Sequence, residues 1–119
     1  MQRNWDIIRK ILLAVEALPT EDSEINSTEF QDINSESVAY HMRLLLDAGL
    51  IVGSCRDAVG PPLCRARHLT WEGHEFLDKI RNESIWRKIK ANARDKGIDL
   101  SFTVIKDLAK VLISGLISS

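Results

Sequence analysis

The sequence predicts a mainly α-helical fold with one small β-hairpin, and residues 34 to 73 provide the main reason. Val38, Met42 and Leu45 repeat at intervals of three and four residues, which predicts an amphipathic helix over about 35–48. Gly49 can then supply the left-handed conformation that ends a helix. Two short stretches typical of paired strands follow, 50–52 and 65–69. The hairpin is followed by Leu-Thr-x-x-Gly, in which Thr70 can cap another helix.

The other elements are predicted from caps, breakers and apolar spacing. A first helix over about 3–18 ends at Pro19, and Glu24-Ile25 can add a short strand to the hairpin. The pattern Asn26-Ser-Thr-Glu29 fits a capping box that opens a short second helix through Ile33. Either Asn34 or Ser35 can cap the helix over 35–48. Further helices are expected over 71–81, over 85–93 with Ser84 as cap, and, after a turn at 96–99, over 102–117 with Ser101 as cap.

This order of elements is the order that a winged helix-turn-helix requires. The helix over 35–48 would be the recognition helix, and residues 50–69 would form the wing, with Val59-Gly60-Pro61-Pro62 at its tip. We therefore expect a winged helix-turn-helix domain over 1–83 and a C-terminal helical extension over 84–119.

Two resemblances agree with this fold. Residues 38–45 with 47–51, and residues 67–73, resemble the recognition helix and the wing of bacterial ArsR-, MarR- and PadR-type regulators. The chain as a whole resembles a family of short bacterial and prophage proteins called domain of unknown function 2513. That resemblance rests on residues 6–12, on Tyr40-His41 through Ala48-Gly49-Leu50, on residues 69–78, and on Trp86 with the closing amphipathic helix. It implies a winged helix and a bacterial or phage origin, and it brings no activity with it.

The resemblance to the regulators implies which residues would contact double-stranded DNA. In those proteins the recognition helix offers its first turn and solvent face to the major groove. The matching positions here are Ser35, Ser37, Ala39, Tyr40 and Arg43. Wing arginines often enter the minor groove or bind phosphates, which adds Arg56, Arg65 and Arg67 to the candidates. The alternative is that all these side chains are simply solvated.

The charge distribution supports a second hypothesis. The net charge is −1, whereas dedicated nucleic-acid binders are usually basic. Residues 1–50 carry four basic and nine acidic side chains, while residues 51–119 carry twelve basic and eight acidic ones. The acidic excess lies before the recognition helix, and Glu36 lies within its first turn. The sequence therefore predicts a DNA-binding transcription regulator, with a protein-interaction module, such as an adaptor or antirepressor, as the alternative.

The cysteines and histidines suggest weaker hypotheses. If Val52 faces Arg67 in the hairpin, Cys55 faces Cys64, so a redox-sensitive wing is possible in principle. His41, His68 and His74 lack the close spacing of a metal site, so no metal is expected. The tryptophans at 5, 71 and 86 are expected in the core. We find no nucleophile–base set or phosphate-binding loop, and expect neither enzymatic activity nor a cofactor.

Length and composition limit the remaining classes. The 119 residues suffice for one compact domain, alone or with an appendage. Apolar runs are far shorter than the roughly 20 residues of a membrane-spanning helix, and no apolar signal segment opens the chain. The bacterial cytoplasm is therefore the expected location. The last helix is apolar enough that it must pack somewhere, either on the first helix or on its copy in a homodimer. We expect the homodimer, through Phe102, Ile105, Leu108 and Leu112.

Overall fold

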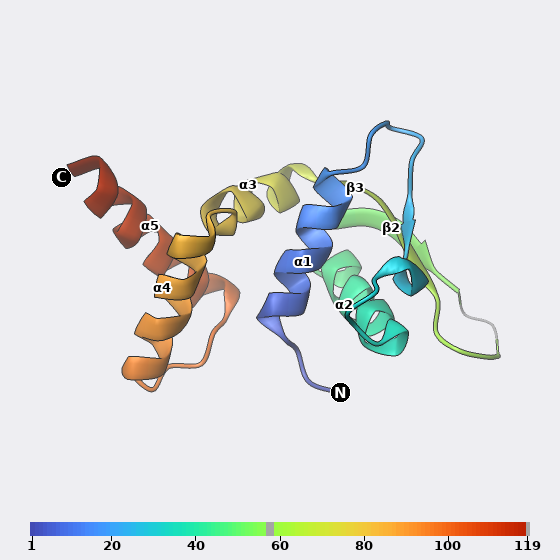
Figure 1. Ribbon diagram of the computed structural model, residues 1–119, viewed down its shortest axis with the longest axis horizontal. Coiled ribbons are helices and arrows are strands. Elements are labelled where there is room, and N and C mark those ends of the chain that lie inside the picture. Colours follow the sequence, from blue (N-terminus) through green and yellow to red (C-terminus); the bar gives the residue numbers. More distant parts are fainter. Residues whose placement is uncertain (57–58, 119) are drawn as a thin grey trace. The chain divides into compact units, whose positions relative to one another are not determined.

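The computed structural model describes residues 1–56 and 59–118, with side chains as far as Gly115, and confirms the predicted fold class (Figure 1). The chain is mainly helical and contains a small three-stranded antiparallel sheet. Its elements are α1 (Trp5–Glu16), β1 (Ile25–Asn26), the 3-10 turn η1 (Ser27–Glu29), α2 (Ser35–Asp47), β2 (Ile51–Cys55), β3 (Cys64–Leu69), α3 (Trp71–Ile80), α4 (Glu83–Asp95) and α5 (Phe102–Ser118).

The chain forms two compact units, Met1–His74 and Glu75–Ser119. The division lies within α3, whereas the sequence had suggested a boundary between residues 83 and 84. The first unit contains α1, α2 and the whole sheet, and the second contains the end of α3 together with α4 and α5.

Side-chain caps start both major helices of the first unit. The Asn4 Oδ1 atom accepts hydrogen bonds from the backbone N–H groups of Asp6 and Ile7, at 2.9 and 3.3 Å, and so fixes the start of α1. Asn34, rather than Ser35, caps α2, because its Oδ1 accepts from the N–H groups of residues 36 and 37. These bonds satisfy backbone donors that have no partner within the helix. The apolar faces that follow the caps form the core of the unit and consist of Trp5, Ile8, Ile11, Leu12, Val15, Val38, Met42 and Leu45.

The predicted second helix is wrong in its length. The predicted cap forms in part, since the Glu29 Oε1 atom accepts the Asn26 N–H at 3.1 Å, but only the single 3-10 turn η1 follows. Phe30 is already extended, with φ −93° and ψ 113°. The segment has no second turn of apolar residues to bury, and helices of one turn gain little from propensity alone. The element before α2 is therefore a turn and an irregular link.

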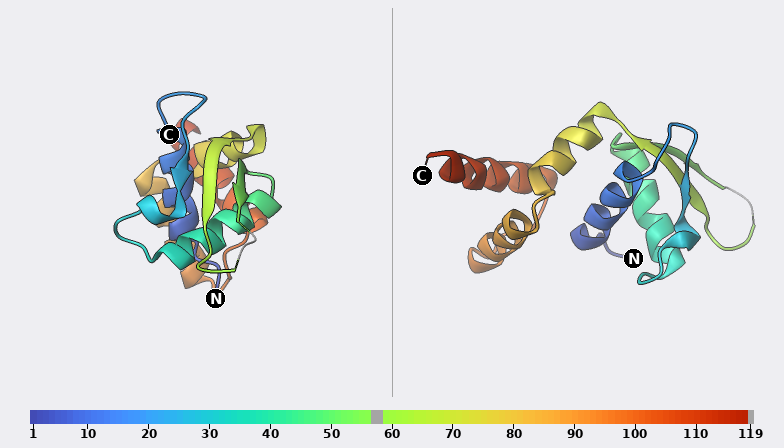
Figure 2. Two further views of the ribbon diagram at one scale, coloured as in Figure 1. Left: turned by 90° about the vertical axis from the view of Figure 1, so that its right-hand side faces the viewer. Right: turned by 45° about the horizontal axis from the view of Figure 1, so that its top comes forward.

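The three strands lie in the order β1-β3-β2 (Figure 2, left). The predicted strand at Ile25 is present and pairs with Ala66. The assumed register of the hairpin is wrong at one point, because Val52 faces His68 and not Arg67. The register shifts between Val52 and Gly53, so that Arg67 is the extra residue of a β-bulge. Beyond the bulge, Cys55 faces Cys64 as predicted.

Thr70 joins the hairpin to α3. Its hydroxyl donates to the Gly49 carbonyl at 2.6 Å and accepts the Gly73 N–H at 3.0 Å, as expected of a cap. A Cβ atom at position 73 would collide with the Leu50 carbonyl, so only glycine allows this close approach. Trp71 is not in the core as predicted: it is 77% exposed, because it occupies the outer side of this first turn.

The second unit is built from helices alone. Asn82, and not Ser84, caps α4, since its Oδ1 accepts the Ile85 N–H at 3.0 Å. Gly97 turns the chain with φ +64°, and the Ser101 hydroxyl then caps α5 as predicted. Helices α4 and α5 pack together. The buried side chains of the unit are Phe76, Leu77, Ile80, Ile85, Trp86, Ile89, Ala93, Ile105 and Ala109.

Helix α5 has more apolar surface than its unit buries. Ile105 is fully buried, and the Phe102 ring stacks edge-on against Phe76 with centroids 4.6 Å apart. These two residues are therefore occupied within the unit and do not form a free dimer surface as had been expected. A second row at helical spacing contains Val104, Leu108 and Val111, of which Val111 is 68% exposed. Among the side chains that the structure describes, this row, called here the α5 row, contains the most exposed apolar residue of the helix, while Leu112, also expected at the dimer surface, is half-buried.

Candidate nucleic-acid interface

Helix α2 presents a polar face opposite its buried one. Ser35 and Arg43 are exposed, and Ser37 and Tyr40 are half-buried. Ala39, also proposed to contact DNA, is only 2% exposed, because it packs beneath the hairpin beside Cys64. Ala39 is therefore removed from the candidate surface, and the other four residues remain on it.

The hairpin carries its arginines on the outer side of the sheet. Arg65 lies in the middle strand between Asn26 and Ser54, and its Nε atom donates to the Ser54 hydroxyl at 3.1 Å. Its guanidinium also lies 3.7 Å from the Glu24 carboxylate. Both side chains are about half exposed, at 57% and 41%, so water screens this ion pair and it contributes little stability. Arg65 is thus held in place but remains reachable by a ligand.

Arg67 and Arg56 have different surroundings. Arg67, in the bulge, is exposed, and its guanidinium forms no hydrogen bond or ion pair with any residue in the described part of the chain. Arg56 donates to the Pro61 carbonyl at 2.8 Å and so ties down the hairpin loop. Arg65 and Arg67 lie on the same side of the sheet despite the bulge, since both line one hollow of about 280 Å³.

A second hollow adjoins the first on the same surface. It has a volume of about 400 Å³ and is lined by Arg56, Arg65, Ser54 and Asn26, with Glu24 shared between the two hollows. Guanidinium groups beside hydroxyl and amide groups are the donors that bind phosphate and carboxylate oxygens. Glu24 opposes an anion here, which makes the site less basic than its arginines alone suggest.

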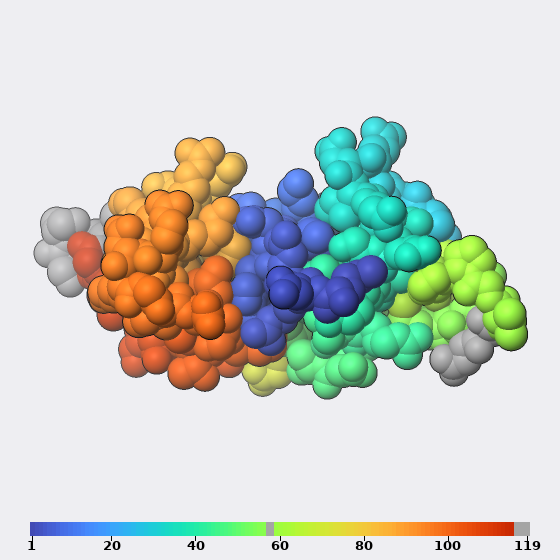
Figure 3. Space-filling model, turned by 90° about the horizontal axis from the view of Figure 1, so that it is seen from below, coloured from blue at the N-terminus to red at the C-terminus, as the bar shows by residue number. Residues whose placement is uncertain are grey.

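The N-terminal segment lies beside the polar face of α2 (Figure 3). Met1 and Pro62 line a mainly apolar hollow of about 220 Å³ together with Glu36, Tyr40 and Arg43 of α2. Two candidate residues of α2, Tyr40 and Arg43, therefore line a depression to which the hairpin loop and the start of the chain also contribute.

His41 holds this segment in place, a role that our sequence interpretation missed. The residue is 1% exposed; its Nε2 atom accepts the Asn4 N–H at 2.8 Å, and its Nδ1–H donates to the Ser37 carbonyl at 2.7 Å. The sequence did contain a signal, because His41 lies three residues after Val38 and four before Leu45, within the apolar repeat. A histidine at such a position is buried, and a buried histidine needs partners.

The electrostatic balance of the first unit is acidic. Residues 1–74 contain seven basic and eleven acidic side chains, a net charge of −4, and Glu36 is exposed in the first turn of α2. The second unit contains nine basic and six acidic side chains. On α4 of that unit, the exposed Arg87 is paired with Glu83 at 3.1 Å. A polyanion would therefore be bound by a few arginines and not by a broadly basic surface.

Metal ligation and membrane crossing were also considered. Among the described residues, no group of three or more His, Cys, Asp and Glu side chains is arranged to hold a metal ion. His68 and His74 are exposed on β3 and α3, while His41 is buried in α2. None of the helices, as far as they are described, has the length and apolar character needed to cross a membrane.

The fold and the surface define a small, mainly helical protein with an arginine-bearing hairpin beside a polar helix face. The chain belongs to the family described as "Hypothetical protein (DUF2513)", whose model matches residues 2–99. It is 41% identical over 118 residues to an "Uncharacterized protein" of Haemophilus influenzae (strain ATCC 51907 / DSM 11121 / KW20 / Rd), covering 99% of this chain and 100% of that relative. No solved structure matches.

Proposed function

We propose that this protein is a winged-helix DNA-binding protein, a transcription regulator of bacterial or phage origin. Helix α2 would enter the major groove, and the β2–β3 hairpin would lie along the backbone as the wing. One observation supports this proposal most: a single compact unit carries both the polar face of α2 and the outward arginines of the hairpin. The order of elements from α1 through the sheet to α3 also fits a winged helix, except that the 3-10 turn η1 stands where the first helix of a helix-turn-helix is expected.

The side chains divide into two roles. Arg43, with Ser35, Ser37 and Tyr40, would contact bases and phosphates from α2. Arg67 is the best phosphate ligand on the hairpin, because no described residue competes for it, whereas Arg65 must exchange the Glu24 carboxylate for phosphate. With so few cations, binding should be of moderate affinity and should weaken clearly as salt rises.

Fluorescence anisotropy with labelled genomic duplex fragments, over a range of salt concentrations, tests this function. Arg43→Ala and Arg67→Ala should each weaken binding. Each should also reduce the magnitude of the negative slope of log K against log salt by about one unit. Lys10→Ala is the matched control: it removes the same charge from an exposed position on α1 in the same unit and should leave the slope unchanged. Equal effects of all three variants, or no binding even at about 50 mM salt, would contradict a specific interface.

The second candidate function is a protein-interaction module. It is favoured by the net charge of −4 in the first unit and by the exposed Trp71, since tryptophans are enriched among the residues that dominate protein interfaces. A basic partner protein would suit this surface. In that case Trp71→Ala would abolish partner binding, while the DNA experiment would show no binding.

A further inference from the structure

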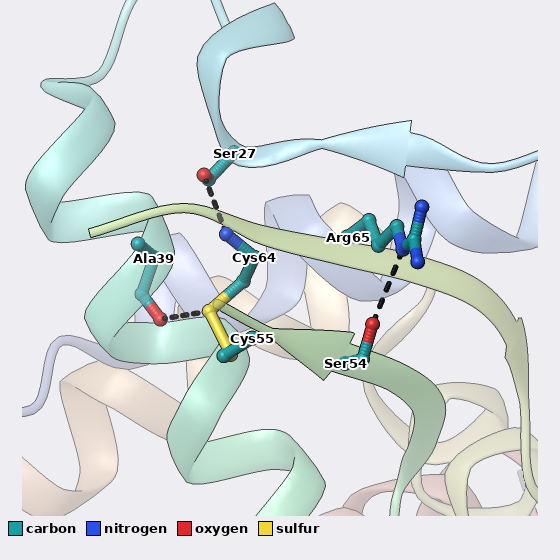
Figure 4. The surroundings of a disulfide bond; sticks show 6 residues. All are labelled: Ser27, Ala39, Ser54, Cys55, Cys64 and Arg65. Atoms are coloured by element: carbon teal, nitrogen blue, oxygen red, sulfur yellow. Dashed lines mark hydrogen bonds between the residues drawn. A yellow bond between two sulfur atoms is a disulfide. The ribbon is translucent and has the colours of Figure 1, made fainter. Parts of the chain in front are cut away.

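The sulfur atoms of the hairpin join its two strands at a point where three elements meet. Cys55 and Cys64 form a disulfide across the β2–β3 pair (Figure 4). The Cys64 Sγ atom lies 3.4 Å from the Ala39 carbonyl oxygen of α2. The Cys64 N–H points the other way, past the end of the two-residue strand β1, and donates to the buried Ser27 hydroxyl at 3.1 Å.

The structure around this disulfide does not depend on the S–S bond. The Ser27 hydrogen bond and the bond from the Arg56 N–H to the Leu63 carbonyl, at 2.8 Å, both remain if the sulfurs separate. The strand register on either side is fixed by backbone pairing. The hairpin can therefore keep its fold in both the thiol and the disulfide forms.

The two sulfurs differ in their access to solvent. Both cysteines line the hollow of about 400 Å³ on the sheet, but Cys64 is 2% exposed, whereas Cys55 is half-buried. A reagent from solvent therefore reaches Cys55 first. The hollow also contains Arg56 and Arg65, whose two positive charges exceed the single negative charge of Glu24 among the described lining residues. Cationic neighbours favour an approaching anion and favour the thiolate form of cysteine.

We propose that the Cys55–Cys64 disulfide is a thiol–disulfide exchange site for an anionic low-molecular-weight thiol, RSH. The thiolate RS⁻ attacks the Cys55 sulfur, the bond between the two cysteines breaks, and Cys64 leaves as a thiolate that takes a proton from water. A second RS⁻ attacks the R sulfur of the mixed disulfide, so that RSSR forms and Cys55 leaves as a thiolate and is protonated. In total the protein gains two electrons and two protons, and two RSH become RSSR.

The exchange changes the chemistry beside α2. In the disulfide form the Cys64 sulfur carries no hydrogen, and its contact with the Ala39 carbonyl is a packing contact. In the thiol form it can donate a weak hydrogen bond to that carbonyl. Because Cys64 also lines the hollow that contains Tyr40 and Arg43, the redox state alters the surroundings of two candidate interface residues.

The test uses the full native chain without denaturant or DNA, so its outcome is independent of the proposed DNA binding. Three thiols of similar size and different charge are compared: 2-mercaptoethanesulfonate, 2-mercaptoethanol and cysteamine. Their rates of reduction, corrected to the thiolate concentration of each, should fall in that order, several-fold from the first to the last. Mass spectrometry after acid quenching should find the adduct on Cys55.

Arg56→Gln and Arg65→Gln should each reduce the ratio of the rate with the sulfonate to the rate with 2-mercaptoethanol. Arg67 does not line this hollow, so Arg67→Gln is the control and should leave that ratio unchanged. Amide signals of residues 39–43 should shift between the two redox forms in NMR spectra. Equal rates for the three thiols, an adduct on Cys64, or a disulfide that resists reduction until the protein is unfolded would each overturn the proposal.

Discussion

Replacing His41 with phenylalanine should destabilise the first unit without creating a large cavity. Phenylalanine keeps an aromatic ring, although a larger one, and it can neither accept the Asn4 N–H nor donate to the Ser37 carbonyl. Each lost hydrogen bond costs about 0.5–1.5 kcal/mol of net stability, so the free energy of unfolding should fall by about 1–3 kcal/mol. Asn4 is itself exposed, which allows water to replace part of the first bond and favours the lower half of this range.

Urea denaturation, followed through the amide signals of α1 and α2 in NMR spectra, measures this effect on the first unit alone. His41→Gln should recover part of the loss, because its carbonyl oxygen can accept the Asn4 N–H. His74→Phe, at an exposed site on α3, should change the stability by less than about 0.5 kcal/mol. The reasoning would be refuted if His41→Phe were as stable as the native chain, or if His41→Gln were no better than His41→Phe.

Three further predictions concern other parts of the chain. Gly73→Ala should destabilise the first unit by about 1–3 kcal/mol in the same denaturation experiment, because the alanine Cβ would meet the Leu50 carbonyl. Gly97→Ala, in the second unit, is the control and should not change the urea transition of the α1 and α2 signals. Asn34→Ala should lower the free energy of unfolding of the first unit by about 1 kcal/mol, because the cap of α2 is lost. Asn34→Asp should retain most of the stability that the cap provides. We further propose that two copies pair through the α5 row, so light scattering should show a dimer. Val111→Glu should convert this dimer to a monomer, whereas Lys106→Glu, a control on the same helix, should not. A native chain that is monomeric would contradict this model.

The helices of the fold were predictable because local chemistry determines them. Apolar spacing placed α1 and α2, and Thr70 and Ser101 began the helices that they were expected to cap. The pairing of Cys55 with Cys64 was also predictable, since hairpin register follows from strand positions once the loop is located. These features depend on residues close together in the sequence, and they needed no knowledge of the packed structure.

The errors arose where distant segments decide the outcome. The β-bulge at Arg67 is set by the approach of Gly53 to β3, where a Cβ at position 53 would collide with the Arg65 carbonyl. The second helix stops after the single turn η1, which packs against α2, although the capping pattern is present. Trp71 was assigned to the core on size alone, although its place in the first turn of α3 turns it toward solvent.

Most residues of the candidate site could be predicted from the sequence, but the side chains that they contact could not. Five of the eight proposed DNA contacts are exposed and two, Ser37 and Tyr40, are half-buried. Ala39 is buried, because residues one position apart on a helix face different surroundings. A strand near Ile25 beside the hairpin was predicted, but the ion pair between Glu24 and Arg65 was not, since the two residues are distant in the chain. The link between His41 and Asn4 likewise joins positions that no local pattern connects.

That link has a practical consequence for anyone preparing the protein. Because the Asn4 N–H is bound to His41, the backbone leading from Met1 is held beside Glu36, Tyr40 and Arg43. An affinity tag, or the few residues left after its cleavage, would emerge at this depression and obstruct the surface whose binding is to be measured. A purification handle at the other end of the chain is not attached to this segment, so binding experiments should use the chain tagged at that end.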